Sequence, residues 1–333
     1  MKRFILVSTI AMVAVGAWAQ DLAGFQDGFE AFAGEMAPTL SYNATVGNNW
    51  SDAYIGNFPH FGVGVAAGAT MIPVESLSAL FETIADDLSI PAALADLGLP
   101  IPAAALSAKL GGFFLPFDIG VKAMILPESV TSSLLSADIS ADYTLIGGNL
   151  RFGIIKSNLL LPDVSVGLGY NRLDGYISMP LDIDTPSFSF GTAPGHTLAA
   201  TEPTLKFNWG TNSFDLTLQV SKKILFLEPF AGAGYSLGKS TVSGGIASQL
   251  LYDGVAVTEA GLAAITEALS QAGIDVPDLT TEGFMFGAEN TEPVLRVYGG
   301  LTLSILILKF DTMIMYVPVN KSLGLSSMIR VQL

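Results

Sequence analysis

Alternation of apolar and polar residues, repeated along most of the chain, constrains the fold more than any other feature of this sequence. One example lies between Thr204 and Val220, where two arms flank Gly210-Thr211-Asn212. The first arm has Leu205, Phe207 and Trp209 on one parity, and the second has Phe214, Leu216, Leu218 and Val220. Side chains on a strand point to opposite faces with period two. The Gly/Asn-containing tripeptide is typical of a turn, so this stretch predicts a hairpin with one apolar face.

Composition decides between a soluble sheet and a membrane barrel. The 333 residues are 50% hydrophobic and 14% charged, with a mean hydropathy of +0.52, whereas soluble domains carry about 25% charged residues. Beyond the N-terminal leader, no segment has the 18 or more consecutive apolar residues expected of a membrane-spanning helix. The combination predicts an all-β fold, a transmembrane antiparallel β-barrel with short helical insertions.

The alternating segments give about twelve strands, with fourteen as the alternative. Two helical insertions would emerge on opposite sides of a twelve-stranded barrel. If both belong outside, the count has one strand too few or one too many. In segment 136–145 we expect Tyr143 and Leu145 to face lipid and Asp142 and Thr144 to face the lumen. The expected strands cover 40–46, 61–71, 113–125, 136–145, 150–154, 164–170, 204–209, 213–220, 231–237, 295–307, 309–316 and 323–333.

The chain divides into three parts. Residues 1–19 have the charged start, apolar core and Ala17-Trp18-Ala19 site of a secretory signal peptide. Residues 20–38 form an N-terminal helical segment or plug, which Pro38 is expected to end. Residues 39–333 form the barrel, with helical insertions at 74–108 and 244–283. The inner parity of 61–71 is nearly all glycine and alanine, which leaves room for a plug or loop inside the barrel.

Several functional classes lack the residues they need. The chain has no cysteine and only two histidines, His60 and His196, and its net charge is −15. We therefore expect no metal, no cofactor and no nucleic-acid partner. Neither histidine accompanies a G-x-S-x-G nucleophile motif, so we expect that the protein is not an enzyme.

Charged residues of the polar parity are the candidate site residues, because a charge facing lipid at mid-bilayer costs about 2–4 kcal/mol. Asp138 and Asp142 share one face and either attract cations or pair with Arg151, Lys206 or Arg296 across the lumen. The full set of lumen-lining candidates is Asp118, Lys122, Asp138, Asp142, Arg151, Lys206, Asp215, Arg296 and Arg330.

The signal peptide, the alternating strands and the final apolar strand 323–333 together resemble Gram-negative outer-membrane β-barrel proteins. That resemblance implies a location in the outer membrane, contact with its lipid, and recognition of the last strand by the barrel assembly machinery. The last residue is Leu333, where an aromatic residue is usual in that class. Length and N-terminal segment are also loosely similar to the fourteen-stranded long-chain fatty-acid channel family, but its Asn-Pro-Ala motif is missing, so no ligand residues are carried over.

These observations predict a channel or transporter for small solutes, partly plugged by inserted segments, whose selectivity comes from inward charges. One alternative is a transporter of hydrophobic, fatty-acid-like compounds, suggested by the apolar faces of the insertions. The other alternative is a surface, adhesin or structural barrel that transports nothing.

Overall fold

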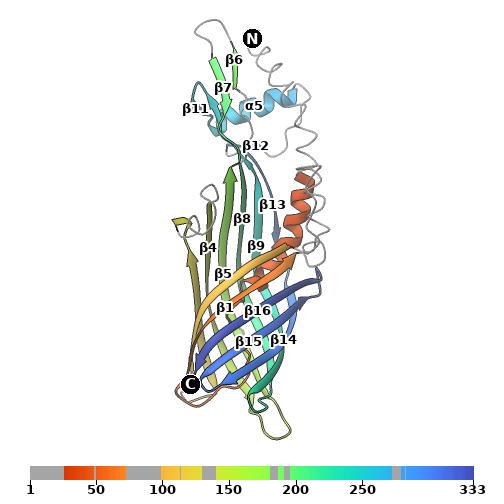
Figure 1. Ribbon diagram of the computed structural model, residues 1–333. Coiled ribbons are helices and arrows are strands. Elements are labelled where there is room, and N and C mark those ends of the chain that lie inside the picture. Colours follow the sequence, from red (N-terminus) through yellow and green to blue (C-terminus); the bar gives the residue numbers. More distant parts are fainter. Residues whose placement is uncertain are drawn as a thin grey trace.

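The computed structural model describes residues 26–48, 50–72, 99–112, 114–129, 140–180, 187–190, 196–271, 279–281 and 283–333. Residues 26–43 are helical and are called the N-terminal helix below. The remaining elements are β1 (His60–Ile72), β2 (Leu99–Gly111), β3 (Phe117–Leu126), β4 (Ser140–Ile155), β5 (Asp163–Pro180), β6 (Ser187–Phe190), β7 (His196–Ala200), β8 (Thr204–Ser221), β9 (Leu227–Ala247), β10 (Leu250–Tyr252), β11 (Val255–Ala256), α5 (Glu259–Gln271), β12 (Leu279–Thr280), β13 (Gly283–Asn290), β14 (Val294–Ile305), β15 (Leu308–Val317) and β16 (Ser322–Gln332) (Figure 1).

Within the described residues, ten strands close into an antiparallel barrel in the order β1, β2, β3, β4, β5, β8, β9, β14, β15 and β16. The last strand returns to the first, with Val331 opposite Val63. One further strand, β13, continues the line of β14 along the upper half of β9, since Asn290 lies opposite Ser240 and Val294 opposite Ser236. The predicted class, an all-β antiparallel membrane barrel, is confirmed.

The predicted number of twelve strands, and the alternative of fourteen, are wrong. Residues 40–46 are the end of the N-terminal helix and a turn. The expected turns at Gly147–Asn149 and Gly210–Asn212 do not exist, because β4 and β8 run straight through them, so each merges two expected strands. One strand was missed, since residues 99–108 belong to β2 rather than to a helical insertion. The barrel itself begins at His60, not at residue 39.

The corrected strand number places the two long interruptions together. They follow β1 and β9, the first and seventh barrel strands in chain order, and both of these strands end at the upper end of the barrel in Figure 1. Connections at the lower end are short, such as residues 222–226 between β8 and β9. Bacterial barrels have short turns on the periplasmic side and longer loops outside, so the upper end is assigned to the outside.

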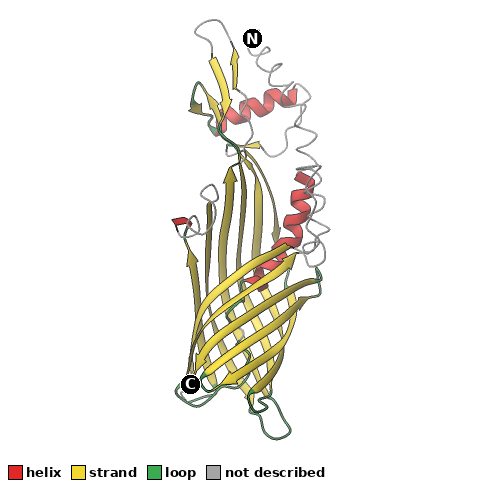
Figure 2. Ribbon diagram, viewed as in Figure 1, coloured by secondary structure: helices red, strands yellow, loops and turns green. Residues whose placement is uncertain are grey.

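A small second sheet and helix α5 lie at this outer end (Figure 2). The sheet has the order β11-β10-β7-β6, and Leu251 of β10 lies opposite Ala199 of β7. The sheet is built from the connections between β5 and β8 and between β9 and β13. Helix α5 lies in the second of these connections, within the insertion expected at 244–283. Among the described residues, no helix has the length and apolar character needed to cross a membrane.

The outer face of the long strands changes from apolar to polar along their length. On β8, Phe214, Leu216 and Leu218 are exposed on the outer face, whereas Phe207 and Trp209, on the opposite parity, pack inside the barrel. The strand is continuous, so the apolar parity itself switches near Gly210. This switch explains the false hairpin, because a change of parity looks the same in sequence as a turn that resets the register.

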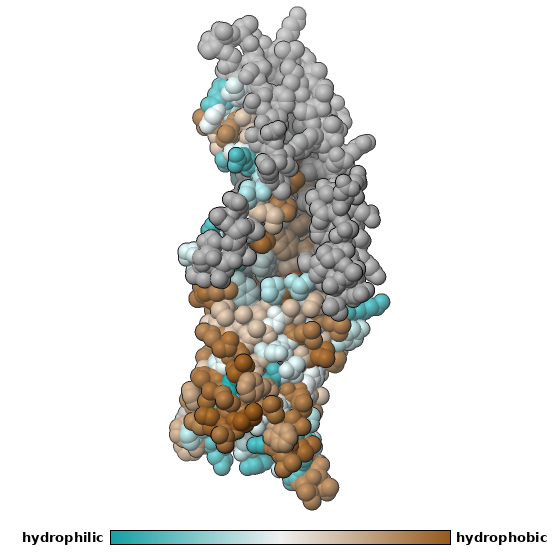
Figure 3. Space-filling view, in the orientation of Figure 1, coloured by the Kyte–Doolittle hydropathy of each residue, from teal (hydrophilic) through white to brown (hydrophobic). Residues whose placement is uncertain are grey.

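The same change occurs in neighbouring strands at one row of the sheet. Arg172, Asn212 and Lys239 lie opposite one another on β5, β8 and β9, and the outward row directly below contains Tyr170, Phe214 and Leu237. Apolar residues gather on the lower part of the barrel in Figure 3. We therefore place the upper edge of the lipid-facing band between these two rows, with the upper strand ends in water.

This boundary predicts opposite outcomes for lysine at two outward positions of β8. Leu216→Lys places a charge in the lipid-facing band and is expected to reduce the free energy of unfolding by about 2–4 kcal/mol. Asn208→Lys, on the same face above the boundary, is expected to change it by less than about 0.5 kcal/mol. Urea-dependent unfolding in lipid vesicles measures both variants, and equal effects would show that the boundary is misplaced.

Candidate functional site: a lumen closed by the N-terminal segment

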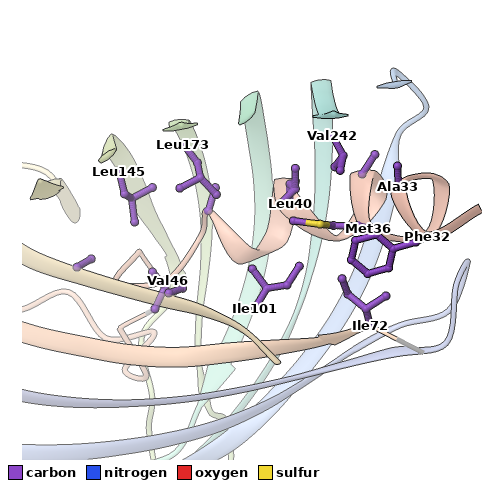
Figure 4. Close-up of a cluster of buried hydrophobic side chains, with 14 of the residues drawn as sticks. Phe32, Ala33, Met36, Leu40, Val46, Ile72, Ile101, Leu145, Leu173 and Val242 are labelled. Carbon is purple, nitrogen blue, oxygen red and sulfur yellow. The ribbon is translucent and has the colours of Figure 1, made fainter. Parts of the chain in front are cut away.

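The N-terminal helix lies inside the upper barrel. Its buried residues Phe29, Phe32, Ala33, Met36 and Leu40 recur at helical spacing, which gives the helix an apolar face. They pack against inward residues of the wall, Leu145, Leu173, Val242, Ile72 and Ile101, as Figure 4 shows. These wall residues belong to the upper strand ends, where the inward-facing side chains are apolar. The apolar face of the helix therefore packs against an apolar inner wall.

The helix continues through Pro38, contrary to the expectation that this residue ends it. An interior proline costs about 3 kcal/mol because it removes a hydrogen bond and clashes with the preceding turn. Enclosure offsets this cost, since Ala37, Thr39 and Leu40 are all within 1% of complete burial. The hydroxyl of Thr39 also donates to the carbonyl of Met36, 2.6 Å away.

After the helix, the chain passes down the lumen; residues 26–48 and 50–53 are called the plug segment below. Its turn at residues 44–48 is held by two wall lysines. Lys122 Nζ donates to the carbonyls of Ala44 and Val46, and Lys109 Nζ donates to that of Asn48 at 3.2 Å. The side chain of Asn48 donates to Asn171 Oδ1 at 2.7 Å.

Trp50 is the largest fully buried side chain of the plug segment. Its ring lies between two cations, with Lys109 Nζ and Arg330 Cζ each 4.9 Å from the ring centroid. A Cβ at Gly62 of β1 would lie 2.4 Å from this ring, so the glycine makes the space that the indole occupies. Cation–π contacts of a desolvated ring contribute about 2 kcal/mol, which fixes Trp50 against the wall.

Below Trp50, a buried ionic cluster joins the plug segment to the last two strands. Asp52 accepts hydrogen bonds from Lys309 at 2.9 Å, Arg330 at 3.1 Å and Gln332 at 2.7 Å. Its backbone carbonyl accepts one from Arg151 at 2.6 Å. Arg330 Nε also forms an ion pair with Asp311 at 2.8 Å, at an angle that does not meet hydrogen-bond geometry. Asp52 is thus the plug segment's charged attachment to the barrel.

Two further buried ion pairs lie on the wall itself. Arg151 pairs in bidentate fashion with Asp118 of β3. Arg296 of β14 donates to Asp215 of β8 at 2.5 and 2.6 Å, across β9, where Gly234 leaves room for the guanidinium. All four side chains are at most 4% exposed.

The described lumen is therefore filled rather than open. A cavity of about 20 Å³ beside Gly47, Ala66 and Phe230 has room for about one water. The upper contacts between plug segment and wall are apolar, and the lower contacts are polar and ionic.

Six of the predicted site residues are buried on the lumen wall: Asp118, Lys122, Arg151, Asp215, Arg296 and Arg330. Asp142 and Lys206 lie on the outer face instead, because their strand neighbours Tyr143, Leu205 and Phe207 pack against the internal core. Both belong to the upper strand ends where the parity is reversed. Asp138 and the predicted signal peptide lie outside the described residues.

Sequence reasoning missed the residues that attach the plug segment to the wall. Trp50 and Asp52 occupy an irregular segment without periodicity, and Lys109 belongs to the missed strand β2. Lys309 and Asp311 share the inward parity of the expected strand 309–316, and this signal could have found them.

No family model and no curated protein matches the sequence. Solved structures with a similar fold include the outer membrane protease OmpT from Escherichia coli, with a TM-score of 0.37, 7% identity, and coverage of 82% of this chain and 97% of that one. The translocator domain of autotransporter NalP from Neisseria meningitidis has a TM-score of 0.33 and 8% identity, with coverage of 83% of this chain and 88% of that one. The transport unit of autotransporter AIDA-I from Escherichia coli has a TM-score of 0.33 and 9% identity, with coverage of 91% of this chain and 99% of that one.

The closed barrel and its apolar outer band show that the chain is a transmembrane β-barrel of the outer-membrane type. The expectation that it is not an enzyme is corrected by the comparison with solved structures. Barrels of similar fold include a protease, so the absence of familiar motifs does not exclude catalysis. The ten-stranded barrel also differs from the fourteen strands implied by the fatty-acid channel resemblance.

Proposed function

We propose that the protein is a gated outer-membrane channel for small solutes, closed in this form by its own plug segment. The observation that carries the proposal is the chemistry of the lower lumen. Its wall presents arginine, lysine, aspartate, glutamine and serine side chains to the plug segment, including Arg330, Gln332 and Gln219. Water can solvate these groups if the plug segment leaves, so the open state is physically accessible.

A permanent filling would be more stable if it were apolar. Replacing buried ion pairs with well-packed hydrophobic residues is often neutral or stabilising by 1–4 kcal/mol. The ionic contacts of Asp52 therefore suit a segment that closes the lumen reversibly. The plug contacts described above come from the N-terminal segment, the other plug candidate of the sequence, whereas the insertion after β1 lies largely outside the described residues.

A disulfide lock tests the proposal directly, since the natural chain has no cysteine. A Cβ built at Gly47 lies 3.7 Å from that of Ser107, within the range of about 3.5–4.5 Å for a disulfide. In planar bilayers, Gly47→Cys/Ser107→Cys is expected to open under voltage or mild urea when reduced, and to stay silent when oxidised.

Both states of this variant carry the same strain at Gly47, where φ is +78° and a side chain costs about 1–2 kcal/mol. The comparison is therefore internal. Ser107→Cys alone is the matched control, and oxidant is expected to leave its openings unchanged. Equal conductance in oxidised and reduced double variant, or silence in both with a folded barrel, would contradict the gated channel.

A second candidate, a transporter of hydrophobic compounds, is favoured by the apolar inner wall around Leu145, Leu173 and Val242. Departure of the N-terminal helix would expose this wall at the outer entrance. Uptake of a hydrophobic dye into vesicles containing the reduced double variant, but not the oxidised one, would support this candidate over a channel for polar solutes alone.

A further inference from the structure

Two lysines of the lumen wall differ from the other cations there. Lys109 of β2 and Lys122 of β3 are 3% and 4% exposed and point inward on paired strands. Lys109 lies opposite Gly120 and Lys122 opposite Ser107, so the two are diagonal neighbours. Residues at this spacing are about 7–8 Å apart, close enough to act on one ligand.

Neither ammonium group has a carboxylate within 4.0 Å among the described residues, whereas Arg151, Arg296, Arg330 and Lys309 each face an aspartate. Their acceptors are instead the carbonyls of Ala44, Val46 and Asn48, just beyond the carboxyl end of the N-terminal helix. A helix presents partial negative charge at this end. The plug segment therefore supplies the negative partner that the wall lacks.

We propose that Lys109 and Lys122 form an anion-binding site of the open lumen, which the plug segment's carbonyl oxygens occupy in the closed form. The inference rests on the proposed function, because the site becomes available only when the plug segment leaves. Unpartnered ammonium groups in a narrow lumen attract the nearest anion. The ligand class is a small anion, such as chloride, inorganic phosphate or a solute carboxylate.

The negative net charge of the chain does not oppose this assignment, because selectivity depends on charges near the path. Asp118, Asp215 and Asp311 each pair with an arginine. Glu228 accepts a hydrogen bond from Ser221 and lies opposite Thr302, on a different side of the barrel from β2 and β3. Asp163, at the start of β5, accepts a hydrogen bond from the backbone N–H of Ser157. The two lysines are thus the local excess charge on their side of the lumen.

The test measures ion selectivity in the full-length chain after a charge-neutral opening. Trp50→Ala removes the ring held between Lys109 and Arg330 without changing the lumen charge. Reversal potentials of its open events in a potassium chloride gradient give the permeability ratio of chloride to potassium. The comparison variant is Trp50→Ala with Lys109→Gln and Lys122→Gln, and the control carries Lys222→Gln and Lys239→Gln, which remove equal charge outside the lumen.

We expect the opened channel to prefer chloride, and the ratio to fall about fiftyfold without the two lysines, because two unit charges about 7 Å from the path in water change the chloride and potassium permeabilities about sevenfold each, in opposite directions. The control is expected to keep the ratio. Cation preference, or a ratio insensitive to Lys109 and Lys122, would overturn the anion site and leave the channel standing. Silence of folded Trp50→Ala, and of the wild type in mild urea, would instead refute the channel and the site with it.

Discussion

Asp52→Asn is expected to give a frequently opening channel, whereas the wild-type barrel is expected to stay closed under the same conditions. The substitution keeps the size of the side chain but removes the charge that Lys309 and Arg330 share, in a place where Asp52 is 1% exposed. Breaking a buried ion pair costs about 3–5 kcal/mol, because the remaining charge is left uncompensated. Release of the plug segment removes this penalty, since both cations then meet water.

The barrel has no comparable way to relieve the penalty, because its strands are joined by continuous ladders of hydrogen bonds. The loss therefore shifts the balance between closed and open forms by roughly a hundred- to a few-thousandfold, at 1.4 kcal/mol per factor of ten. Single-channel recordings of opening frequency measure the shift. Asp174→Asn is the matched control, since Asp174 forms an exposed pair with Arg172 and such pairs contribute about 0–1 kcal/mol.

An Asp52→Asn barrel that remains folded and silent would show that the ionic cluster does not hold the lumen closed. Folding is checked separately by the heat-dependent shift in electrophoretic mobility of intact barrels. A variant that opens as often as Asp174→Asn would lead to the same conclusion.

The sequence predicts the fold wherever a strand has two different solvents on its two faces. On the lower part of β8, lipid lies outside and the polar lumen inside, and the alternation of Phe214, Leu216 and Leu218 with Ser213 and Asp215 follows directly. Above the lipid band the solvents exchange sides, because water lies outside and the N-terminal helix inside. The alternation remains regular there but has the opposite meaning, which is why Asp142 and Lys206 were placed in the lumen.

The plug segment was harder to predict because its lower part contacts neither lipid nor bulk water on any side. Leu40, Tyr42 and Ala44 alternate with Ser41, Asn43 and Thr45, which suggested a strand, yet all six are buried. When every side of a helix is enclosed, the 3.6-residue pattern disappears and accidental alternation carries no information. Trp50 and Asp52 follow in an irregular stretch, where only three-dimensional contacts reveal a role.

The glycines of β1 are an intermediate case. Their inward parity was readable from the sequence, and it indicated space inside the wall without saying what fills it. The structure supplies the occupant, since the ring of Trp50 rests where a Cβ of Gly62 would be. A bare inner wall therefore predicts a plug, while the identity of the plug depends on contacts distant in sequence.

Asp215→Asn is expected to have the largest effect on the stability of the barrel itself. It leaves the fully buried Arg296 without its bidentate carboxylate partner. The guanidinium group then keeps its contact with the ring of Tyr298, whose centroid lies 5.9 Å from the guanidinium carbon. The expected loss in the free energy of unfolding is about 3–5 kcal/mol. Urea-dependent unfolding in lipid vesicles measures it, with Ser213→Ala, one inward position away on β8, as the control for a mild polar deletion.

Replacing both partners separates charge pairing from space filling. Asp215→Leu with Arg296→Met removes the pair and its desolvation cost together, and buried pairs exchanged in this way are often neutral or stabilising. The double variant is therefore expected to recover most of the stability lost by Asp215→Asn. A double variant as unstable as the single one would mean that the wall depends on the hydrogen bonds to Ser236 rather than on charge. In that case hydrogen bonds to buried polar groups, rather than ion pairing, would hold β8, β9 and β14 together around the plug segment.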